Sequence, residues 1–494
     1  MTSARAAWAR ALGVAAGLGA VTALGQAPFG LPIAMMIGLA GAIWYFAAAR
    51  SPKAALLYGW AFGFGYFALT LHWIVSPFLV DVARHGWMAP FAVVLMALGG
   101  GAFWALAFWT ARRLSPQAWP LILTLPTVEL IRAYIFTGFP WGTLAQATVD
   151  SLAGQSLALW GPYALTLWLV AVAVAVARSG AHPLPRVLLA IGAAALLWIP
   201  PQVPPAPMTD QTWRIVQPNA PQHLKWDPAM IPMFFDRQLE FTAAPTTGPQ
   251  PDAILWPETA IPWRLDRAGA ALSEIAVAAN GTPVILGVQR ADGERYFNAL
   301  IALDGDGQIT QTYDKHHLVP FGEYIPLGDF MARFGVTAMA PQHGAGFSAG
   351  PGPRTLDLGP LGRALPLICY EAVFAHDLNA PTRADYILHA TNDAWFGTFA
   401  GPQQHLAQAR MRAIEQGLPV IRAANTGISA MIDPWGRLRD SLKLNVAGYL
   451  DAGLPAPRAP TPYARTGDLP LAVLLLAGLI GAAAQRRRTL RRPK

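Results

Sequence analysis

Three residue types that together could perform acyl chemistry occur in the second half of the chain: a glutamate, a lysine and the chain's only cysteine. Cys369 follows the apolar run Ala364–Ile368, and Glu258 closely follows the run Ala253–Trp256. Lys315 lies between them. A deprotonated thiol is a nucleophile, a carboxylate can accept its proton, and an ammonium can stabilise an oxyanion. The pattern predicts nucleophile, base and cation, although a lone cysteine is more often a small buried hydrophobic residue.

Short strands must position these three residues, because a nucleophile at a strand end is held out of the sheet. Short apolar runs alternate with helical stretches and turns between about residues 205 and 465, which predicts an α/β layered domain. The expected strands are Trp213–Gln217, Ala253–Trp256, Pro283–Val288, Phe297–Leu303, Ala364–Ile368, Tyr386–Ala390, Pro419–Ala423 and Ile428–Ile432. The expected helices are Pro228–Ala243, Gly269–Ala279 and Gln403–Gln416.

The remainder of the chain is too apolar for a single soluble domain. Of 494 residues, 54% are hydrophobic and 13% are charged, and the mean hydropathy is +0.34. Eight apolar runs approach the about 20 residues that cross a bilayer as a helix. They cover roughly 8–25, 31–49, 55–75, 88–111, 118–137, 156–178, 186–201 and 468–484. The sequence therefore predicts a multi-span α-helical membrane bundle with eight transmembrane helices, plus the α/β domain.

The expected spans divide the chain into three parts. Residues 1–204 hold seven transmembrane helices, 205–465 form an extracytoplasmic domain, and 466–494 hold the eighth helix and a basic tail. Basic residues of short loops stay on the cytoplasmic side. Arg112, Arg113 and the run Arg486–Arg488 fall on one side, and we expect both termini there. The net charge of +8 then lies largely in loops and tail, so no nucleic-acid partner is expected.

Four motifs in the α/β part resemble those of the nitrilase superfamily. They are WPETA at 256–260, YDKHHLVPFGEYIP at 313–326, ICYE at 368–371 and NDAWF at 392–396. Taken with the membrane spans, they resemble the membrane-embedded branch of that superfamily, the apolipoprotein N-acyltransferases of Gram-negative bacteria. The resemblance covers essentially the whole chain, and Glu258, Lys315 and Cys369 all match its catalytic positions.

The resemblance implies an αββα sandwich with the three catalytic residues on loops at strand ends. It implies that a fatty acyl chain moves from a phospholipid donor to a Cys369 thioester, and then to the N-terminal amine of a diacylglyceryl-cysteine apolipoprotein. It also implies the bacterial inner membrane, with the catalytic domain in the periplasm. Two other interpretations stay open: a membrane-tethered amidase or nitrilase hydrolysing a C–N bond with the same triad, and a transporter whose insert only binds ligand.

The resemblance also assigns supporting or substrate-binding positions. Glu323 and Glu371 match acidic positions that could position Lys315 or adjust its electrostatics, and a structural role is nearly as strong an alternative. The backbone N–H of Tyr370 is expected to donate to the oxyanion. Trp226 matches a tryptophan near the lipid site, with ordinary aromatic packing as the alternative.

Other ionisable residues give weaker signals. His316 and His317 are adjacent, and neighbouring side chains on a strand point in different directions, so we expect no metal site. No dinucleotide or phosphate-binding glycine motif follows a strand, so no cofactor is expected. Glu129 and Arg132 lie three residues apart on the fifth expected span. This spacing favours a mutual ion pair that fixes helix packing, with a transport or lipid-headgroup role as the alternative.

Overall fold

The structure is a computed structural model that describes residues 2–177, 183–246, 248–326, 346–378, 380 and 382–491. The chain divides into two compact units, each described by itself below. The helical unit holds residues 1–203, 399–407 and 461–494, and the α/β unit holds 204–398 and 408–460. The apolar pattern of the sequence gave no indication that residues 399–407 belong to the helical unit. The predicted boundaries of the membrane and extracytoplasmic parts stay a prediction.

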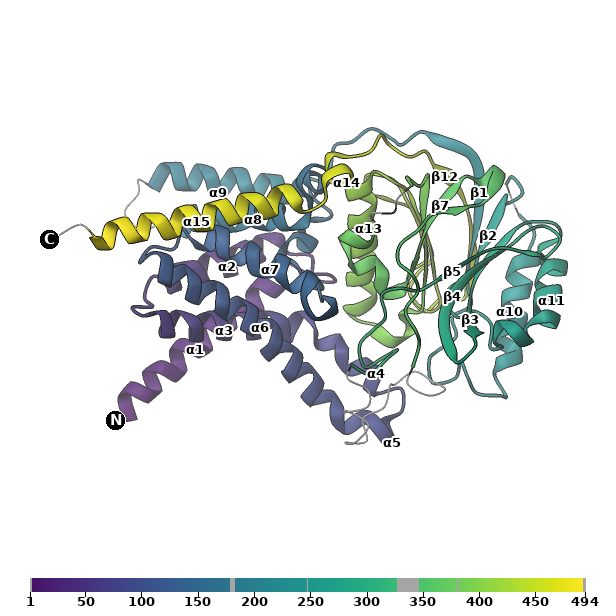
Figure 1. Cartoon of the computed structure of the whole chain (residues 1–494), viewed down its shortest axis with the longest axis horizontal. Helices are drawn as coiled ribbons and strands as arrows, with labels where there is room; N and C mark the ends of the chain where they lie inside the picture. The colour runs from purple at the N-terminus through teal and green to yellow at the C-terminus, as the bar shows by residue number, and fades with distance from the viewer. Residues whose placement is uncertain are drawn as a thin grey trace. The chain divides into compact units, whose positions relative to one another are not determined.

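The helical unit consists mainly of apolar helices (Figure 1). Its α-helices are α1 (Thr2–Ala23), α2 (Pro32–Phe46), α3 (Pro52–Thr70), α4 (Val75–Phe78), α5 (Val82–His85), α6 (Ala89–Leu114), α7 (Leu121–Tyr134), α8 (Leu157–Ala177), α9 (Pro183–Trp198), α14 (Pro462–Thr466) and α15 (Leu469–Arg491). Proline at the first or second position of α2, α3 and α6 suits a helix start, where the missing N–H has no partner to lose.

Fewer helices than expected are long enough to cross a membrane. In the described chain, four segments pass by length and hydropathy: Arg5–Ala23, Val82–Leu114, Ala153–Ala177 and Leu469–Leu490. The pair Pro52–Thr70 and His72–Phe78, bent by 58°, makes a fifth if it counts as one span. The other expected spans are α2, α7 and α9, which have 15, 14 and 16 residues. The eight transmembrane helices are therefore not confirmed, because these three are short for a bilayer.

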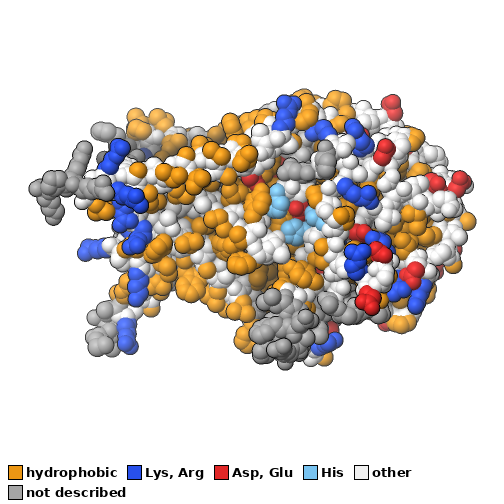
Figure 2. Space-filling model, viewed as in Figure 1, with side chains coloured by type: hydrophobic (Ala, Val, Ile, Leu, Met, Phe, Trp, Pro, Cys, Tyr) orange, Lys and Arg blue, Asp and Glu red, His pale blue; other side chains and the backbone are white. Residues whose placement is uncertain are grey.

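The surface of the helical unit is nonetheless strongly apolar. In Figure 2, hydrophobic side chains cover much of its visible face, and Lys and Arg gather at the end where both termini lie in Figure 1. On α15, Leu469, Val473 and Ile480 are each more than half exposed. Exposed apolar faces of this extent are typical of helices that contact lipid or another protein.

Close helix packing in this unit depends on glycine. A Cβ built at Gly65 of α3 would lie 1.9 Å from the carbonyl oxygen of Ala16 in α1. One built at Gly63 would lie 2.7 Å from the Cα of Gly101 in α6. Small residues at such contacts let membrane helices approach through backbone atoms. The expected ion pair also forms on α7, where an Arg132 guanidinium nitrogen lies 2.6 Å from Glu129 Oε2.

The α/β unit contains two six-stranded sheets, with strand orders β12-β1-β2-β3-β4-β5 and β11-β10-β9-β8-β7-β6. The strands are β1 (Met208–Gln217), β2 (Ala253–Leu255), β3 (Val284–Asp292), β4 (Arg295–Leu303), β5 (Ile309–Asp314), β6 (Leu356–Asp357), β7 (Arg363–Ile368), β8 (Tyr386–Thr391), β9 (Val420–Ala424), β10 (Ala430–Ile432), β11 (Leu438–Ser441) and β12 (Gly448–Pro455). The α-helices are α10 (Ile231–Ala243), α11 (Gly269–Ala279) and α13 (Gly401–Gln416), whose first turns belong to the helical unit.

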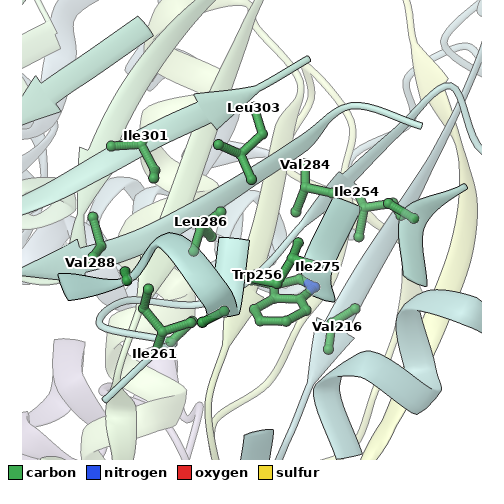
Figure 3. Close-up of a cluster of buried hydrophobic side chains, with 14 of the residues drawn as sticks. Val216, Ile254, Trp256, Ile261, Ile275, Val284, Leu286, Val288, Ile301 and Leu303 are labelled. Carbon is green, nitrogen blue, oxygen red and sulfur yellow. The ribbon is translucent and has the colours of Figure 1, made fainter. Parts of the chain in front are cut away.

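The two sheets face each other, and helices cover their outer faces (Figure 1). Trp213 of β1 and Tyr386 of β8 meet between the sheets, with ring centroids 5.4 Å apart. Figure 3 shows the core under α10 and α11, where Trp256 is surrounded by aliphatic side chains of β2, β3 and β4. The layers run helix, sheet, sheet, helix, as the resemblance implied.

All eight expected strands and three expected helices have counterparts in the structure. Four strands, β5, β6, β11 and β12, were not among those expected. The longest of the four, β12, has the sequence GYLDAGLP, which contains Gly, Asp and Pro, residues that are rare in strands. It pairs antiparallel with β1 at the edge of its sheet, where a proline in the strand is tolerated. In both sheets, parallel neighbours end at the same edge, and Glu258 and Cys369 follow such ends. Lys315 follows β5, which pairs antiparallel with β4.

Candidate active site

Cys369 lies at the carboxyl end of β7, where the chain turns into the short 3-10 helix Cys369–Val373. Its φ of +50° is in the left-handed region, which residues with a side chain rarely adopt. β7 pairs in parallel with β8, so the thiol and the residues that follow β8 meet at one edge of the sheet. The turn holds the thiol out of the sheet while leaving the residue 5% exposed.

Glu258 follows β2 and is held by donors on both carboxylate oxygens. Oε1 accepts a hydrogen bond from Asn298 Nδ2 at 2.7 Å, and Oε2 accepts one from the backbone N–H of Asn392 at 2.9 Å. β3 presses against its main chain, since a Cβ built at Gly287 would lie 2.7 Å from Glu258 Cα. The absence of a side chain at Gly287 therefore allows the backbone of Glu258 to pack closely against β3. The Glu258 carboxylate is buried, and its hydrogen bonds orient it.

Lys315 extends from the end of β5. Its backbone N–H donates to the carbonyl oxygen of Asn298 at 2.9 Å, which fixes the start of the loop. Its Nζ lies 2.9 Å from Glu323 and 3.5 Å from Glu258 Oε1, and the side chain is 1% exposed. One ammonium thus stands between two buried carboxylates.

Electrostatics connects the three predicted residues. Burial disfavours the charged form of Lys315, but Glu323 and Glu258 outweigh it and raise its pKa, so the ammonium stays charged. Burial raises the pKa of the Cys369 thiol, and the charge of Glu258 raises it further, while Lys315 lowers it in part. The thiol is therefore neutral at rest and within electrostatic reach of both other groups, so the structure brings the predicted triad together.

The two supporting glutamates differ in what they contact. Glu323 touches the ammonium of Lys315 and also accepts from Asn298 Nδ2 at 3.0 Å. Glu371 is fully buried, and its oxygens accept from the backbone N–H groups of His316 at 2.8 Å and Ile368 at 2.7 Å. Glu371 therefore joins the loop after Lys315 to the strand end before Cys369 and acts on the backbone.

The two predicted aromatic residues lie in different surroundings. The Tyr370 ring is buried, with its centroid 4.9 Å from that of Phe374. Trp226 is partly buried and lines a small pocket together with Phe234, Phe235 and Pro257. One of the lining residues, Pro257, directly precedes Glu258, and most of the lining residues are apolar. Trp226 therefore forms part of an apolar wall beside Glu258.

The adjacent histidines do not point apart as the sequence analysis expected. His317 Nδ1 lies 2.8 Å and His316 Nε2 lies 3.4 Å from the same Asp377 oxygen, because the chain has left β5 and no longer alternates. Within the described residues, these three form a group whose ligand atoms could surround a metal ion. His316 Nδ1 is also 2.7 Å from Glu371. The expectation that the two histidine side chains point in different directions was therefore wrong. The absence of a metal stays a prediction.

Sequence reasoning missed Asn298 and a polar network behind the nucleophile. Asn298 bridges Glu258 and Glu323, and its signal was a single amide in the apolar strand YFNALIAL. Behind Cys369, His389 contacts the Cys369 carbonyl oxygen at 3.2 Å, and Arg422 lies 2.8 Å from His389 Nδ1. Both are fully buried on apolar strands, where a polar residue is uncommon unless it has partners.

Comparisons with known proteins agree with this arrangement. The family "Apolipoprotein N-acyltransferase N-terminal domain" matches residues 18–175, and the family "Carbon-nitrogen hydrolase" matches residues 226–458. The apolipoprotein N-acyltransferase of Rhodopseudomonas palustris is 38% identical over 95% of this chain and 94% of its own. The apolipoprotein N-acyltransferase of Caulobacter vibrioides is 36% identical over 96% of this chain and 94% of its own. The chain belongs to the apolipoprotein N-acyltransferase family.

Two solved structures are similar to part of this apolipoprotein N-acyltransferase family member. An amidase from Nesterenkonia sp. has 18% identity and a TM-score of 0.37, covering 55% of this chain and 98% of its own. A CN-hydrolase superfamily protein from Xanthomonas campestris has 21% identity and a TM-score of 0.37, covering 50% and 91%. The family relationship rests on the full-length relatives, and it makes this chain an acyltransferase with a carbon-nitrogen hydrolase domain.

Proposed function

We propose that this protein transfers a fatty acyl chain from a phospholipid to the N-terminal amine of a diacylglyceryl-cysteine apolipoprotein. The observation that carries the proposal is the buried ammonium of Lys315, which lies 3.5 Å from Glu258 Oε1. The charges of both Lys315 and Glu258 act on the Cys369 thiol. These groups supply a base, an oxyanion stabiliser and a nucleophile. Full-length relatives with the same printed name support the choice of substrates.

In the first half-reaction, Cys369 Sγ attacks the ester carbonyl carbon of the phospholipid as Glu258 accepts the thiol proton. Because the resting thiol is neutral, proton transfer accompanies the attack. Lys315 and the backbone N–H of Tyr370 donate to the oxyanion that forms. The bond from carbon to the glycerol oxygen then breaks, Glu258 returns the proton to that oxygen, and lysophospholipid leaves. The acyl group remains as a Cys369 thioester.

In the second half-reaction, the neutral α-amine of the apolipoprotein attacks the thioester carbonyl carbon. An α-amino group has a pKa of about 8, so a neutral fraction is present near pH 7. Glu258 accepts the proton that the amine loses. The bond from carbon to Sγ breaks, the sulfur takes back the proton, and an amide has formed. Alternating donor and acceptor at one cysteine gives ping-pong kinetics.

The supporting residues take separate roles in this proposal. Glu323, 2.9 Å from Lys315 Nζ, holds the ammonium in place as Glu258 gains and loses its proton. Glu371 fixes the backbone on both sides of the site. Trp226 lines the wall that receives the lipid.

We propose further that the chain crosses the bacterial inner membrane eight times, with both termini cytoplasmic and residues 205–465 in the periplasm. Support comes from the apolar surface of the helical unit and from the basic residues at the end with the termini (Figure 2). The short helices α2, α7 and α9 would complete their spans with flanking residues. Membrane lipid is thus a partner, and both substrates keep their acyl chains in it.

Intact-mass spectrometry of the purified full-length protein tests the proposal. After incubation with phospholipid, we expect one acyl mass on the wild type and lysophospholipid in the medium. Cys369→Ala, which removes the nucleophile, should show neither product and should unfold at the wild-type temperature. Hydrolysis of small amides without an acyl adduct would instead identify the membrane-tethered amidase. Function that survives Cys369→Ala would favour a transporter.

A further inference from the structure

A second buried lysine, Lys225, lies beside the triad and has no part in the two half-reactions. It is 8% exposed, and its Nζ donates to the main-chain carbonyl oxygen of Glu258 at 3.3 Å. The carboxylate of Glu258 acts on it electrostatically, as does the Cys369 thiol when it is deprotonated. Lys225 is therefore a second cation of the same site.

The ammonium of Lys225 has unused hydrogen-bonding capacity. It carries three N–H donors, and within the described residues only the long bond to Glu258 satisfies one of them. No described carboxylate lies within 4.0 Å of it, in contrast to Lys315. Burial lowers the pKa of Lys225 to about 8, with Glu258 and Cys369 acting in the opposite direction. The ring of Trp226, with its centroid 5.1 Å from Nζ, offsets part of the cost of burying this charge. A buried ammonium without a carboxylate partner stays costly unless a ligand supplies an anion.

The surroundings of Lys225 favour an anionic ligand. Lys225 lines the small pocket with Trp226, Ile231, Phe234 and Phe235, so apolar side chains make up much of the wall. Such a wall keeps water away and strengthens the attraction between a cation and an anion. An anion bound there would meet a charge that water does not screen.

The two lysines can meet two groups of one substrate. Lys315 contacts the carboxylate end of Glu258, and Lys225 contacts its main-chain end. Both ammonium groups therefore contact the same residue, one at each end of it. A phospholipid likewise carries two groups that attract positive charge on one molecule: the ester carbonyl and the phosphate diester across the glycerol.

We propose that Lys225 binds the phosphate diester of the donor phospholipid while Lys315 faces the ester carbonyl that Cys369 attacks. This proposal rests on the proposed function, since it assigns a recognition site for its donor. With Lys225 charged, the two ammonium groups balance Glu258 and Glu323, and the incoming phosphate meets a neutral site. Without it, the phosphate would meet an excess of negative charge.

The test compares phospholipid with diacylglycerol carrying the same acyl chains, which has the same esters and no phosphate. Thioester formation is followed by intact mass in the full-length protein. In Lys225→Met, we expect kcat/KM with phospholipid to fall roughly 10- to 100-fold, the range for a lost charged hydrogen bond. The rate with diacylglycerol should stay near that of the wild type. Lys225→Arg should recover part of the loss, and Lys443→Met, at an exposed lysine, should change neither rate.

The possible outcomes separate this proposal from the proposed function. Equal losses with both lipids would overturn the phosphate site, because they indicate a role in folding or in the chemistry itself. Unchanged rates with both lipids would overturn it as well. Inorganic phosphate that slows the diacylglycerol reaction in the wild type but not in Lys225→Met would assign the site to free phosphate. A wild type that forms a thioester with neither lipid would refute the proposed function.

Discussion

Each unit of the molecule buries a carboxylate beside a cation, and the two sites are built differently. In the helical unit, Glu129 is fully buried; Trp104 Nε1 donates to one oxygen at 2.7 Å, and Arg132 lies 2.6 Å from the other. Arg132 also donates to the carbonyl oxygens of Phe139 and Trp141. Each oxygen of Glu129 has a close partner, and among the described residues Arg132 pairs with no other carboxylate.

Glu258 in the α/β unit is oriented just as firmly, but its cation is shared. Lys315 lies closer to Glu323, at 2.9 Å, than to Glu258, at 3.5 Å, and a titratable thiol is within reach. Glu258 can therefore gain a proton without leaving Lys315 unpaired. Burial and pairing alone therefore do not distinguish Glu258 from Glu129; the shared cation and the nearby thiol do.

Glu258→Gln tests the chemical side of this comparison and should have the largest effect. The amide can still accept a hydrogen bond but cannot accept a proton from Cys369. We expect thioester formation to fall about 1,000-fold, within the range for a lost general base, and the unfolding temperature to change little. Intact mass against time measures the rate. Glu240→Gln, at an exposed glutamate of α10, is the matched control. A rate that falls equally in both variants would remove Glu258 from the mechanism.

Glu129→Ala tests the structural side. It leaves the Arg132 guanidinium buried without its carboxylate, so we expect the free energy of unfolding to fall by about 3–5 kcal/mol. Denaturant unfolding in detergent measures it. The rate of thioester formation per folded molecule should not change.

A double variant separates charge from volume at this pair. Replacing Glu129 by Leu and Arg132 by Met removes both charges at once, and stability should recover in part, because neither ion is left alone. A double variant no more stable than Glu129→Ala would mean that packing, and not the unpaired charge, caused the loss.

The sequence predicted Glu258 and Cys369 because each follows an apolar run that was recognisable by itself, and it predicted Lys315 from the motif YDKHHLVPFGEYIP at 313–326. Their catalytic roles stay predictions. The sequence also predicted the ion pair of Glu129 and Arg132 from their spacing on one helix. Asn298 was not predicted, since an amide in a strand carries no sign of which residues it will touch across the sheet. Lys225 was not predicted either, because its sequence neighbours do not show that it contacts Glu258, 33 residues away.

The helix lengths show a second limit of the sequence. Apolar runs predicted spans at 31–49 and 118–137, but α2 and α7 end earlier. α7 contains Pro126, and its last turns hold the buried Glu129 and Arg132, which serve packing inside the unit. An apolar run records that residues avoid water, and it does not tell whether lipid or protein surrounds them.

Gly287→Ala moves Glu258 without changing its chemistry, and so sharpens the requirement for orientation. The added Cβ would lie 2.4 Å from the backbone nitrogen of Thr259 and 2.7 Å from Glu258 Cα, so the loop must shift. A small misplacement of a catalytic group can cost about 100-fold. We expect a loss of roughly 10- to 100-fold in thioester formation. Gly269→Ala, where a Cβ meets nothing within 4 Å, should leave the rate unchanged. Equal activity of both variants would show that Glu258 tolerates displacement.

The smallest expected effect on stability concerns the contact between His316 and Glu371. Glu371 lies two residues from Cys369, but like Glu129 it has a close partner on each carboxylate oxygen. His316 Nδ1 is 2.7 Å from Glu371. Burial alone would lower the pKa of His316, but Asp377 and Glu371 outweigh it and raise the pKa to about 10. Its value in the unfolded chain is about 6.5. The charged histidine therefore stabilises the fold fully below pH 6.5, and this contribution is lost as the pH rises toward 10.

His316→Asn should remove this dependence. We expect the wild-type unfolding temperature to fall relative to that of His316→Asn between pH 6.5 and 10, by a few degrees, with thioester formation at pH 6.5 little changed. Thermal unfolding at a series of pH values measures it, and His223→Asn, at an exposed histidine, is the control. Parallel curves for wild type and His316→Asn would show that His316 is not a charged partner of Glu371. A large loss of activity in His316→Asn would instead move Glu371 from the structural carboxylates to the catalytic ones.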